Sequence, residues 1–208
     1  MFTPTHRVLR ETVVLVMLLT CAACGAARAP VVEANRIAEV LALQPGMWVA
    51  DVGAGKGEWT KDLADRVGET GHVFSTEVDE DDVEEIRRIT DSAGLTNVTT
   101  LLGQADESGL PDECCDAILL RLVYHHFTDP PEMSRSLYRA LRPGGLIAVI
   151  EIEPQSHWPE LTDVPDRGGH GIPAEELIEE MTSEGFEVMG RHEPWEGQPD
   201  RYCVVFRR

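Results

Sequence analysis

"VADVGAGKGEW", residues 49–59, joins an apolar, strand-like run to an acid and then to a turn of alternating glycines. Asp51 lies near the end of the apolar run, and Glu58 follows the turn at the predicted start of a helix. Glycine lets the backbone adopt conformations barred to other residues and lets a bound molecule approach the main chain closely. The first amide groups of the helix point toward the same place. The stretch therefore predicts a strand, a ligand-binding turn and a helix, with glycines at 53, 55 and 57.

The chain on both sides of this stretch alternates between helix-like and strand-like patterns with short connections. Apolar residues at helical spacing, closed by glycine or proline, indicate the helices. We predict helices at 31–43, 58–67, 81–94, 130–145 and 173–185. We predict strands at 47–52, 72–78, 98–103, 116–122, 146–152, 186–193 and 201–208.

Five strands separated by helices favour a parallel sheet covered on both faces, because crossovers between parallel strands are right-handed. The last two strands, joined by a turn-rich segment, are expected to form a hairpin. The predicted fold class is therefore α/β, a Rossmann-like, doubly wound, mostly parallel seven-stranded sheet with a C-terminal antiparallel hairpin. Ligands of such sheets bind at the carboxyl ends of the strands, near the point where strand order reverses. The glycine turn lies at such an end.

Length and charge limit the organisation of the chain and its partners. With 208 residues, of which 42% are hydrophobic, the chain can fill one core and is short for two. Its formal net charge is −19. Such a surface repels phosphate backbones, so we expect no nucleic acid partner.

Residues 1–30 have the pattern of a bacterial secretory signal, which leaves one folded domain at 31–208. Basic residues precede an apolar run at 13–19, and small residues follow it. "CAACG" resembles a lipobox in which Cys24 is lipidated, with Cys21 as the alternative. An ordinary signal cut nearby and a retained anchor stay open as alternatives. We expect an exported protein, periplasmic or attached to the membrane through Cys24; a misassigned start codon would make it cytoplasmic.

Cysteines and histidines do not have the spacing of a metal site. Two of the five cysteines belong to the leader, Cys114 and Cys115 are adjacent, and Cys203 stands alone in a strand-like run. Histidines and acids after the fourth and fifth strands could converge, yet no pair has the tight helical spacing of a strong ligand motif. We therefore expect no metal.

The residues around the glycine turn select the ligand. A dinucleotide-binding turn would place its third glycine at position 58, where this chain has Glu58, and a carboxylate there opposes a pyrophosphate. Asp51, two residues before the first glycine, adds a second negative group that suits an ammonium. A ligand with an amino acid head, a ribose and no phosphate fits better. S-adenosylmethionine (SAM) is such a molecule.

With these motifs the sequence resembles the class I SAM-dependent methyltransferases, and more narrowly the small-molecule branch that includes the ubiquinone and menaquinone methyltransferases. The resemblance covers roughly residues 33–207. Its first motif is "DVGAGKG", and its second, with an acid at the end of the second strand, is "FSTEVD". "GQADESGLPDECCDAILL" and "LRPGGLIAVIE" follow in order. The resemblance implies SAM as the cofactor.

The family pattern also implies how SAM is held. Asp51 would bind the methionine amino group, directly or through water. Glu77, 24 residues after Gly53, would bind both ribose hydroxyls, with Asp79 as the fallback. The main chain of the glycine turn would contact the cofactor at Gly53, Ala54, Gly55 and Gly57.

The adenine and the reacting groups are expected near the third and fourth strands. Asp106 matches the position that contacts the adenine amino group, although the acid can fall where this chain has Gln104. "LRLVYHHFTDP" presents further residues at the end of the sheet that faces the cofactor, and histidine is the natural general base near neutral pH. Alternatively, the histidine pair only shapes the pocket, as is common in this branch. The candidates are Arg121 for the cofactor and Tyr124, His125 and His126 for catalysis.

These expectations lead to a function with two alternatives. The chain would transfer a methyl group from SAM to a small organic acceptor by in-line displacement, and Trp158 and Trp195 could supply apolar walls for a flat acceptor. Alternatively, it is a non-catalytic module that holds SAM or a nucleoside in the cell envelope. Methylation of a protein side chain is a third possibility. An exported methyltransferase would need SAM delivered outside the cytosol or carried with it, because SAM is made in the cytosol.

Overall fold

A computed structural model gives the structure of the protein and describes residues 28–159 and 161–208. The predicted lipidation site, Cys24 or Cys21, lies outside these residues. The first helix begins at Arg28, two residues before the predicted end of the leader at residue 30. Within the described residues, no helix has both the length and the apolar character required to span a bilayer.

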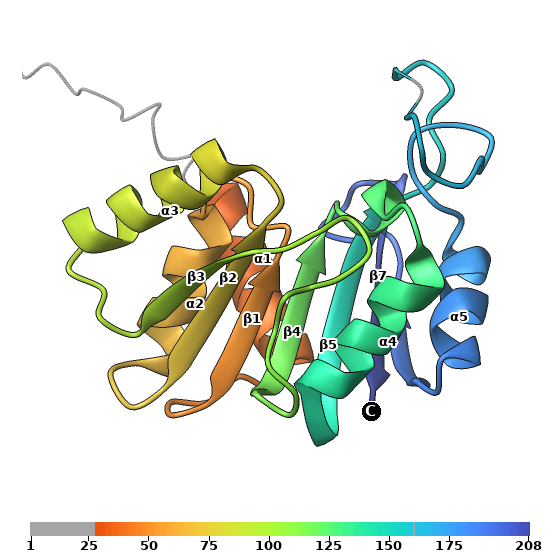
Figure 1. The fold of residues 1–208 in the computed structure, drawn as a ribbon. Helices are drawn as coiled ribbons and strands as arrows, with labels where there is room; N and C mark the ends of the chain where they lie inside the picture. The colour runs from red at the N-terminus through yellow and green to blue at the C-terminus, as the bar shows by residue number, and fades with distance from the viewer. Residues whose placement is uncertain (1–27, 160) are drawn as a thin grey trace, which may run out of the picture.

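A single seven-stranded sheet runs through the middle of the molecule in the order β3-β2-β1-β4-β5-β7-β6 (Figure 1). Strands β1 to β5 pair in parallel, whereas β7 is antiparallel to both β5 and β6. This topology confirms the predicted fold class. The strands are β1 (Trp48–Val52), β2 (His72–Glu77), β3 (Val98–Leu102), β4 (Cys115–Arg121), β5 (Leu141–Ile152), β6 (Glu187–His192) and β7 (Arg201–Arg207).

Helices cover both faces of the sheet (Figure 1). One apolar cluster joins the first two helices to the sheet through Ile37 and Leu63. The other joins the last two helices to the opposite face through Leu137 and Leu177. The helices are α1 (Arg28–Val40), α2 (Glu58–Val67), α3 (Glu80–Ser92), α4 (Pro130–Ala140) and α5 (Ala174–Ser183), with a 3-10 turn, η2, at Tyr124–His126.

One predicted boundary is wrong. The helix expected at 130–145 ends at Ala140, and β5 starts at Leu141, so that "LRPGG" belongs to the strand. Leu141 pairs with Cys115 on β4 ahead of a bulge, and the amide of Gly144 donates to the carbonyl of Arg208 at 3.0 Å. Proline and glycine correctly signal that a helix cannot continue, but long-range pairing decides where the next strand begins.

The carboxyl ends of β1, β2, β4 and β5 lie at the same edge of the sheet, because these strands are parallel. Strand order reverses between β1 and β4, where the chain turns from one side of the sheet to the other. The glycine turn and η2 follow these two strands. The fold therefore brings together the two motifs that the sequence singled out.

Candidate active site

The glycine turn connects β1 to α2. Gly53 and Gly55 have φ angles of +70° and +55°. The amides of Gly53 and Ala54 each donate to the carbonyl of Thr76 at 3.0 Å, which ties the turn to β2. A Cβ atom at Gly53 would lie 2.3 Å from Cγ2 of Val123, whereas one at Gly55 would meet nothing within 4 Å. Packing thus requires glycine at 53, and glycine at 55 leaves space for a ligand.

Glu77 lies beside this turn at the end of β2. Its Oε1 accepts a hydrogen bond from the amide of Gly55 at 2.9 Å, and its Oε2 accepts one from the amide of Val78 at 2.6 Å. Gly53 and Glu77 line the same crevice. The alternative acid, Asp79, caps α3 by accepting from two amides of its first turn. Glu77 is therefore the acid that faces the crevice.

Asp51 lies at the end of β1 and is almost fully buried, with 2% of its surface exposed. Its Oδ2 accepts a hydrogen bond from Oγ1 of Thr60 at 2.6 Å, and this hydroxyl lies 2.8 Å from Oγ of Ser75. Burial raises the pKa of Asp51 to about 6, against the opposing effect of the Thr60 hydrogen bond, and the nearby Glu77 raises it further. A bound cation would favour the ionised form.

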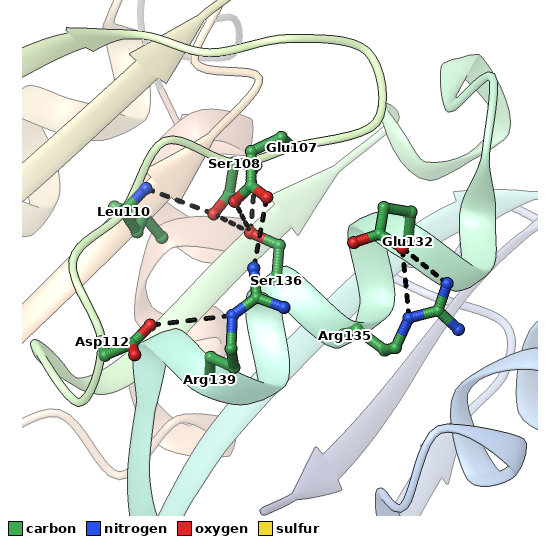
Figure 2. A network of polar contacts seen from close by, with 8 residues as sticks. All are labelled: Glu107, Ser108, Leu110, Asp112, Glu132, Arg135, Ser136 and Arg139. Carbon is green, nitrogen blue, oxygen red and sulfur yellow. Dashed lines mark hydrogen bonds and ion pairs between the residues drawn. The ribbon is translucent and has the colours of Figure 1, made fainter.

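Segment 103–108 forms the opposite wall of the crevice and is fixed to α4 by a polar network (Figure 2). Oγ of Ser136 donates to the carboxylate of Glu107, and Arg139 donates to the same carboxylate at 3.2 Å. The amide of Ser108 donates to Oγ of Ser136 at 3.2 Å. These contacts hold a segment that has no strand or helix of its own.

A buried carboxylate organises the turn after β4. Glu151, fully buried on β5, accepts through Oε1 from the amide of Tyr124 at 2.7 Å. Its Oε2 accepts from Nδ1 of His125 at 2.7 Å. The ring of Tyr124 is also fully buried, and its hydroxyl lies 3.2 Å from Oγ of Ser134 on α4. Burial raises the pKa of this hydroxyl, so the geometry gives Tyr124 a packing role.

A cavity of about 500 Å³ lies on the other side of η2, under segment 153–173. His125 forms part of its wall, whereas the neighbouring His126 lines the crevice. The pKa of His126 is lowered to about 4, mainly by partial burial and to a smaller extent by the nearby His125 and His170. Its ring is therefore neutral at physiological pH. The rest of the cavity wall is partly apolar and includes Trp158, Leu161, Val164 and Arg167.

The site has two compartments, the crevice beside the glycine turn and the neighbouring cavity, with His125 and His126 between them. This arrangement suits the binding of two ligands. A family model described as "Methyltransferase domain" matches residues 43–202, which is most of the chain. The chain belongs to this family.

Curated relatives agree with this methyltransferase assignment over part of their length. A ubiquinone/menaquinone biosynthesis C-methyltransferase from Vibrio vulnificus is 33% identical over 109 residues, which are 52% of this chain and 42% of that protein. A demethylmenaquinone methyltransferase from Listeria welshimeri is 30% identical over 113 residues, 54% of this chain and 48% of that protein. The chain thus matches about half the length of these relatives.

Solved structures share the fold. A SAM-dependent methyltransferase from Aquifex aeolicus has a TM-score of 0.71 and 24% identity, over 87% of this chain and 92% of that chain. At this identity the likeness describes the fold alone.

The methyltransferase domain brings many of the predicted site residues to one edge of the sheet. Asp51, Glu77 and the glycine turn meet there, and Gly57 precedes α2 with a φ of +78°. Gln104, the alternative to Asp106, lines the crevice, and Asp106 is not among the lining residues. The specific contacts of these residues with a ligand stay predictions.

Arg121 has partners of its own. Its Nε and Nη2 donate to the carboxylate of Glu33 at 3.0 and 2.9 Å, and its guanidinium lies 4.7 Å from the centre of the Trp59 ring. Nε1 of Trp195 donates to the same carboxylate at 2.9 Å. Trp195 is 1% exposed and packs in the core, so the expected role as an acceptor wall is wrong for this residue. Trp158, the other candidate, does line the cavity.

The sequence does not indicate the buried partners Glu33 and Thr60, and it places Glu151 only among the acids near the end of the fifth strand, without a partner. Glu33, Thr60 and Glu151 each hold a predicted residue in place, namely Arg121, Asp51 and His125. Glu33 and Thr60 lie within helix-like patterns, and Glu151 lies in an apolar strand. A charged residue inside such a strand is the one signal that could have pointed to Glu151, because buried carboxylates require partners.

Proposed function

We propose that this protein transfers a methyl group from SAM to a small organic acceptor by in-line displacement. The acceptor attacks the methyl carbon, the carbon–sulfur bond breaks with its electron pair on sulfur, and S-adenosylhomocysteine is released. The observation that carries the proposal is the pair of carboxylates, Asp51 and Glu77, on either side of the glycine turn in a chain of the methyltransferase family.

The crevice suits each part of SAM. Glu77 is already held by the amide of Gly55, so its oxygens face the position proposed for the ribose hydroxyls. Asp51 supplies negative charge for the methionine amino group. The formal net charge of −19 also favours the approach of a cationic cofactor over that of a phosphate-bearing one.

The cavity beside His125 is the proposed acceptor site. Its volume of about 500 Å³ is in the range of small-molecule pockets. Trp158, Leu161 and Val164 provide apolar contact, and Arg167 provides charge within the wall. Positioning of the two reactants would supply most of the rate enhancement, because the sulfonium already activates the methyl group.

Calorimetric titration with SAM and with S-adenosylhomocysteine tests the proposal. We expect both to bind, and Glu77→Ala to weaken binding by about 1.5 to 3 kcal/mol, roughly 10- to 150-fold. Glu77→Gln preserves the side-chain shape, and Glu84→Ala removes an exposed carboxylate of α3 as the control. An absence of binding would overturn the proposal. Binding without formation of S-adenosylhomocysteine across a panel of small acceptors would instead favour a cofactor-holding module.

We further propose that the protein is exported and attached to the membrane through Cys24. The basic residues, the apolar run at 13–19 and the sequence "CAACG" support this. Cell fractionation of the wild-type chain and of Cys24→Ala and Cys21→Ala tests it. We expect only Cys24→Ala to release the protein from the membrane fraction. A wild-type protein found entirely in the cytosol would contradict export.

A further inference from the structure

Three imidazole rings from two separate parts of the chain meet between the crevice and the cavity. His125 and His126 belong to η2, and His170 belongs to the loop that follows β5. One ring nitrogen from each lies within 4.8 Å of the others. The ring centres are 4.2 to 5.5 Å apart. The sequence allowed these histidines to converge, but their spacing is not that of a metal motif, so no metal was expected. The fold brings the three rings together.

The ring of His125 is oriented so that only one of its two nitrogens makes a hydrogen bond. Glu151 can only accept, so Nδ1 of His125 carries the hydrogen of their 2.7 Å bond. In the neutral ring, Nε2 then has a free lone pair. His125 is 3% exposed, and its Nε2 is buried. This nitrogen has no hydrogen-bond partner among the described residues. A buried, unpaired acceptor is costly unless something binds it.

His170 is oriented in the same way. Its Nδ1 lies 3.1 Å from the carbonyl oxygen of Pro159, which accepts only, so Nδ1 donates and Nε2 again keeps its lone pair. The backbone of His170 is fixed as well, because its amide and carbonyl both bond with Gln155, at 3.3 and 2.9 Å. Two of the three rings therefore have one nitrogen held by an acceptor and the other available.

We propose that His125, His126 and His170 form a binding site for a divalent transition metal of the zinc class, with its fourth position open toward the cavity. Three protein ligands with one open position are typical of catalytic zinc sites. A histidine that donates its second nitrogen to a carboxylate, as His125 does to Glu151, is the usual support of a metal ligand. The proposal does not depend on methyl transfer.

The distances allow such a site after a small adjustment. Zinc–nitrogen bonds of about 2.0 to 2.1 Å in a tetrahedral arrangement place the nitrogens about 3.3 Å apart. The three nitrogens, all within 4.8 Å of one another, would therefore approach by about 1.5 Å at most. His126 is the least buried of the three residues, so its ring would make most of this adjustment. The buried Glu151 supplies negative charge, and Arg167, the cation in the cavity wall, is paired with Glu176 and Glu180 at 3.2 and 2.6 Å.

The open position indicates the class of ligand that would reach the metal. It faces a cavity whose wall is partly apolar and partly polar, and a zinc-class ion binds oxygen or sulfur groups that lose a proton readily, such as phenols, enols and thiols. This step rests on the proposed function, because it treats such a molecule as the methyl acceptor. The metal itself is tested separately.

Titration of tag-free protein with Co²⁺, followed by visible absorption and by calorimetry with Zn²⁺, tests the site. We expect one ion per chain with the absorption of four-coordinate Co²⁺. His170→Ala should weaken binding by roughly 100-fold or more because it removes one of three ligands. Glu151→Gln should weaken it about 10- to 100-fold, since it keeps the volume but loses the oriented hydrogen bond. The matched control is His157→Ala, an exposed histidine of the same loop.

SAM titration of the same preparations separates this proposal from the proposed function. Metal affinity that is equal in wild type, His170→Ala and His157→Ala would overturn the metal site, as would a wild type that binds neither ion. SAM binding that persists in His170→Ala would show that the variant is folded, so its loss of Co²⁺ absorption would support the site. A wild-type protein that binds Co²⁺ but not SAM would overturn only the proposed function.

Discussion

At the scale of single residues, Asp51 combines a binding role with a cost to stability. It is a carboxylate with 2% exposure whose pKa is raised to about 6, mainly by burial. A folded protein that must hold such a group ionised is less stable at neutral pH than one without it. A ligand with an ammonium group would offset this cost, because it favours the ionised carboxylate.

SAM binding is expected to weaken as the pH falls below about 6, where Asp51 in the free protein becomes protonated. The cationic ligand favours the ionised form, so binding must then release a proton, and affinity should fall about tenfold for each pH unit below that value. Calorimetry between pH 5 and 8 measures the slope. A flat profile would remove Asp51 from the binding site.

Asp51→Asn should make the free protein more stable above pH 6. The folded pKa of about 6 exceeds the ordinary value of 3.8, so the carboxylate costs stability that builds up between these values and is constant above them. The gain at pH 8 should be at most roughly 3 kcal/mol. Urea unfolding at pH 8 and pH 4 measures it. The gain should fall to a small fraction of this value at pH 4, and an equal gain at both pH values would contradict the assignment.

At the scale of elements, the turn between β1 and α2 contains glycines that are required for different reasons. Gly53 and Gly55 both have positive φ, but only Gly53 is packed against Val123. The same residue type therefore serves packing at one position and access at the other.

Gly53→Ala should destabilise the protein by about 2 to 4 kcal/mol, through left-handed backbone strain and overlap with Val123. Gly55→Ala should cost only about 1 to 2 kcal/mol, from the backbone alone, yet still weaken SAM binding. Thermal unfolding and SAM titration of both variants test this. Adding Val123→Ala should recover part of the stability lost in Gly53→Ala and none of that lost in Gly55→Ala.

Elements were predicted well where one local pattern decides them. α2 has the predicted bounds, because Gly57 and Gly68 punctuate both of its ends. β5 was predicted to start at residue 146 and starts at Leu141, because its first residues pair with distant segments. The sequence motifs predicted Asp51 and Glu77 as site residues, and the structure places both beside the glycine turn. Their buried partners, and the approach of His170 to His125, depend on contacts between distant segments that no local pattern records.

At the scale of the whole molecule, the order of the strands makes β7, the last strand in the sequence, essential for the stability of the sheet. β7 lies between β5 and β6. Val204 and Phe206 are buried on one face of the sheet, and Cys203 and Val205 are buried on the other. Without β7, the strand β6 would lose its one neighbour in the sheet and β5 would gain an unpaired edge.

A chain that ends at Asp200 should therefore lose cooperative unfolding, whereas the full chain should melt in one transition. The expected signature is loss of the sigmoidal thermal melt with retention of some helical circular dichroism. Met189→Gln, an exposed position on β6, serves as the control and should leave the melt unchanged. A sigmoidal melt of the shortened chain would show that the first five strands form an independent unit.

The interior place of β7 also has a consequence for biosynthesis. Residues 201–207 leave the ribosome after all the other strands, so the nascent chain can form local helices but cannot close its sheet until synthesis of this segment is finished. In the export that we propose, such an incomplete polypeptide would still be loosely structured when the translocation channel threads it.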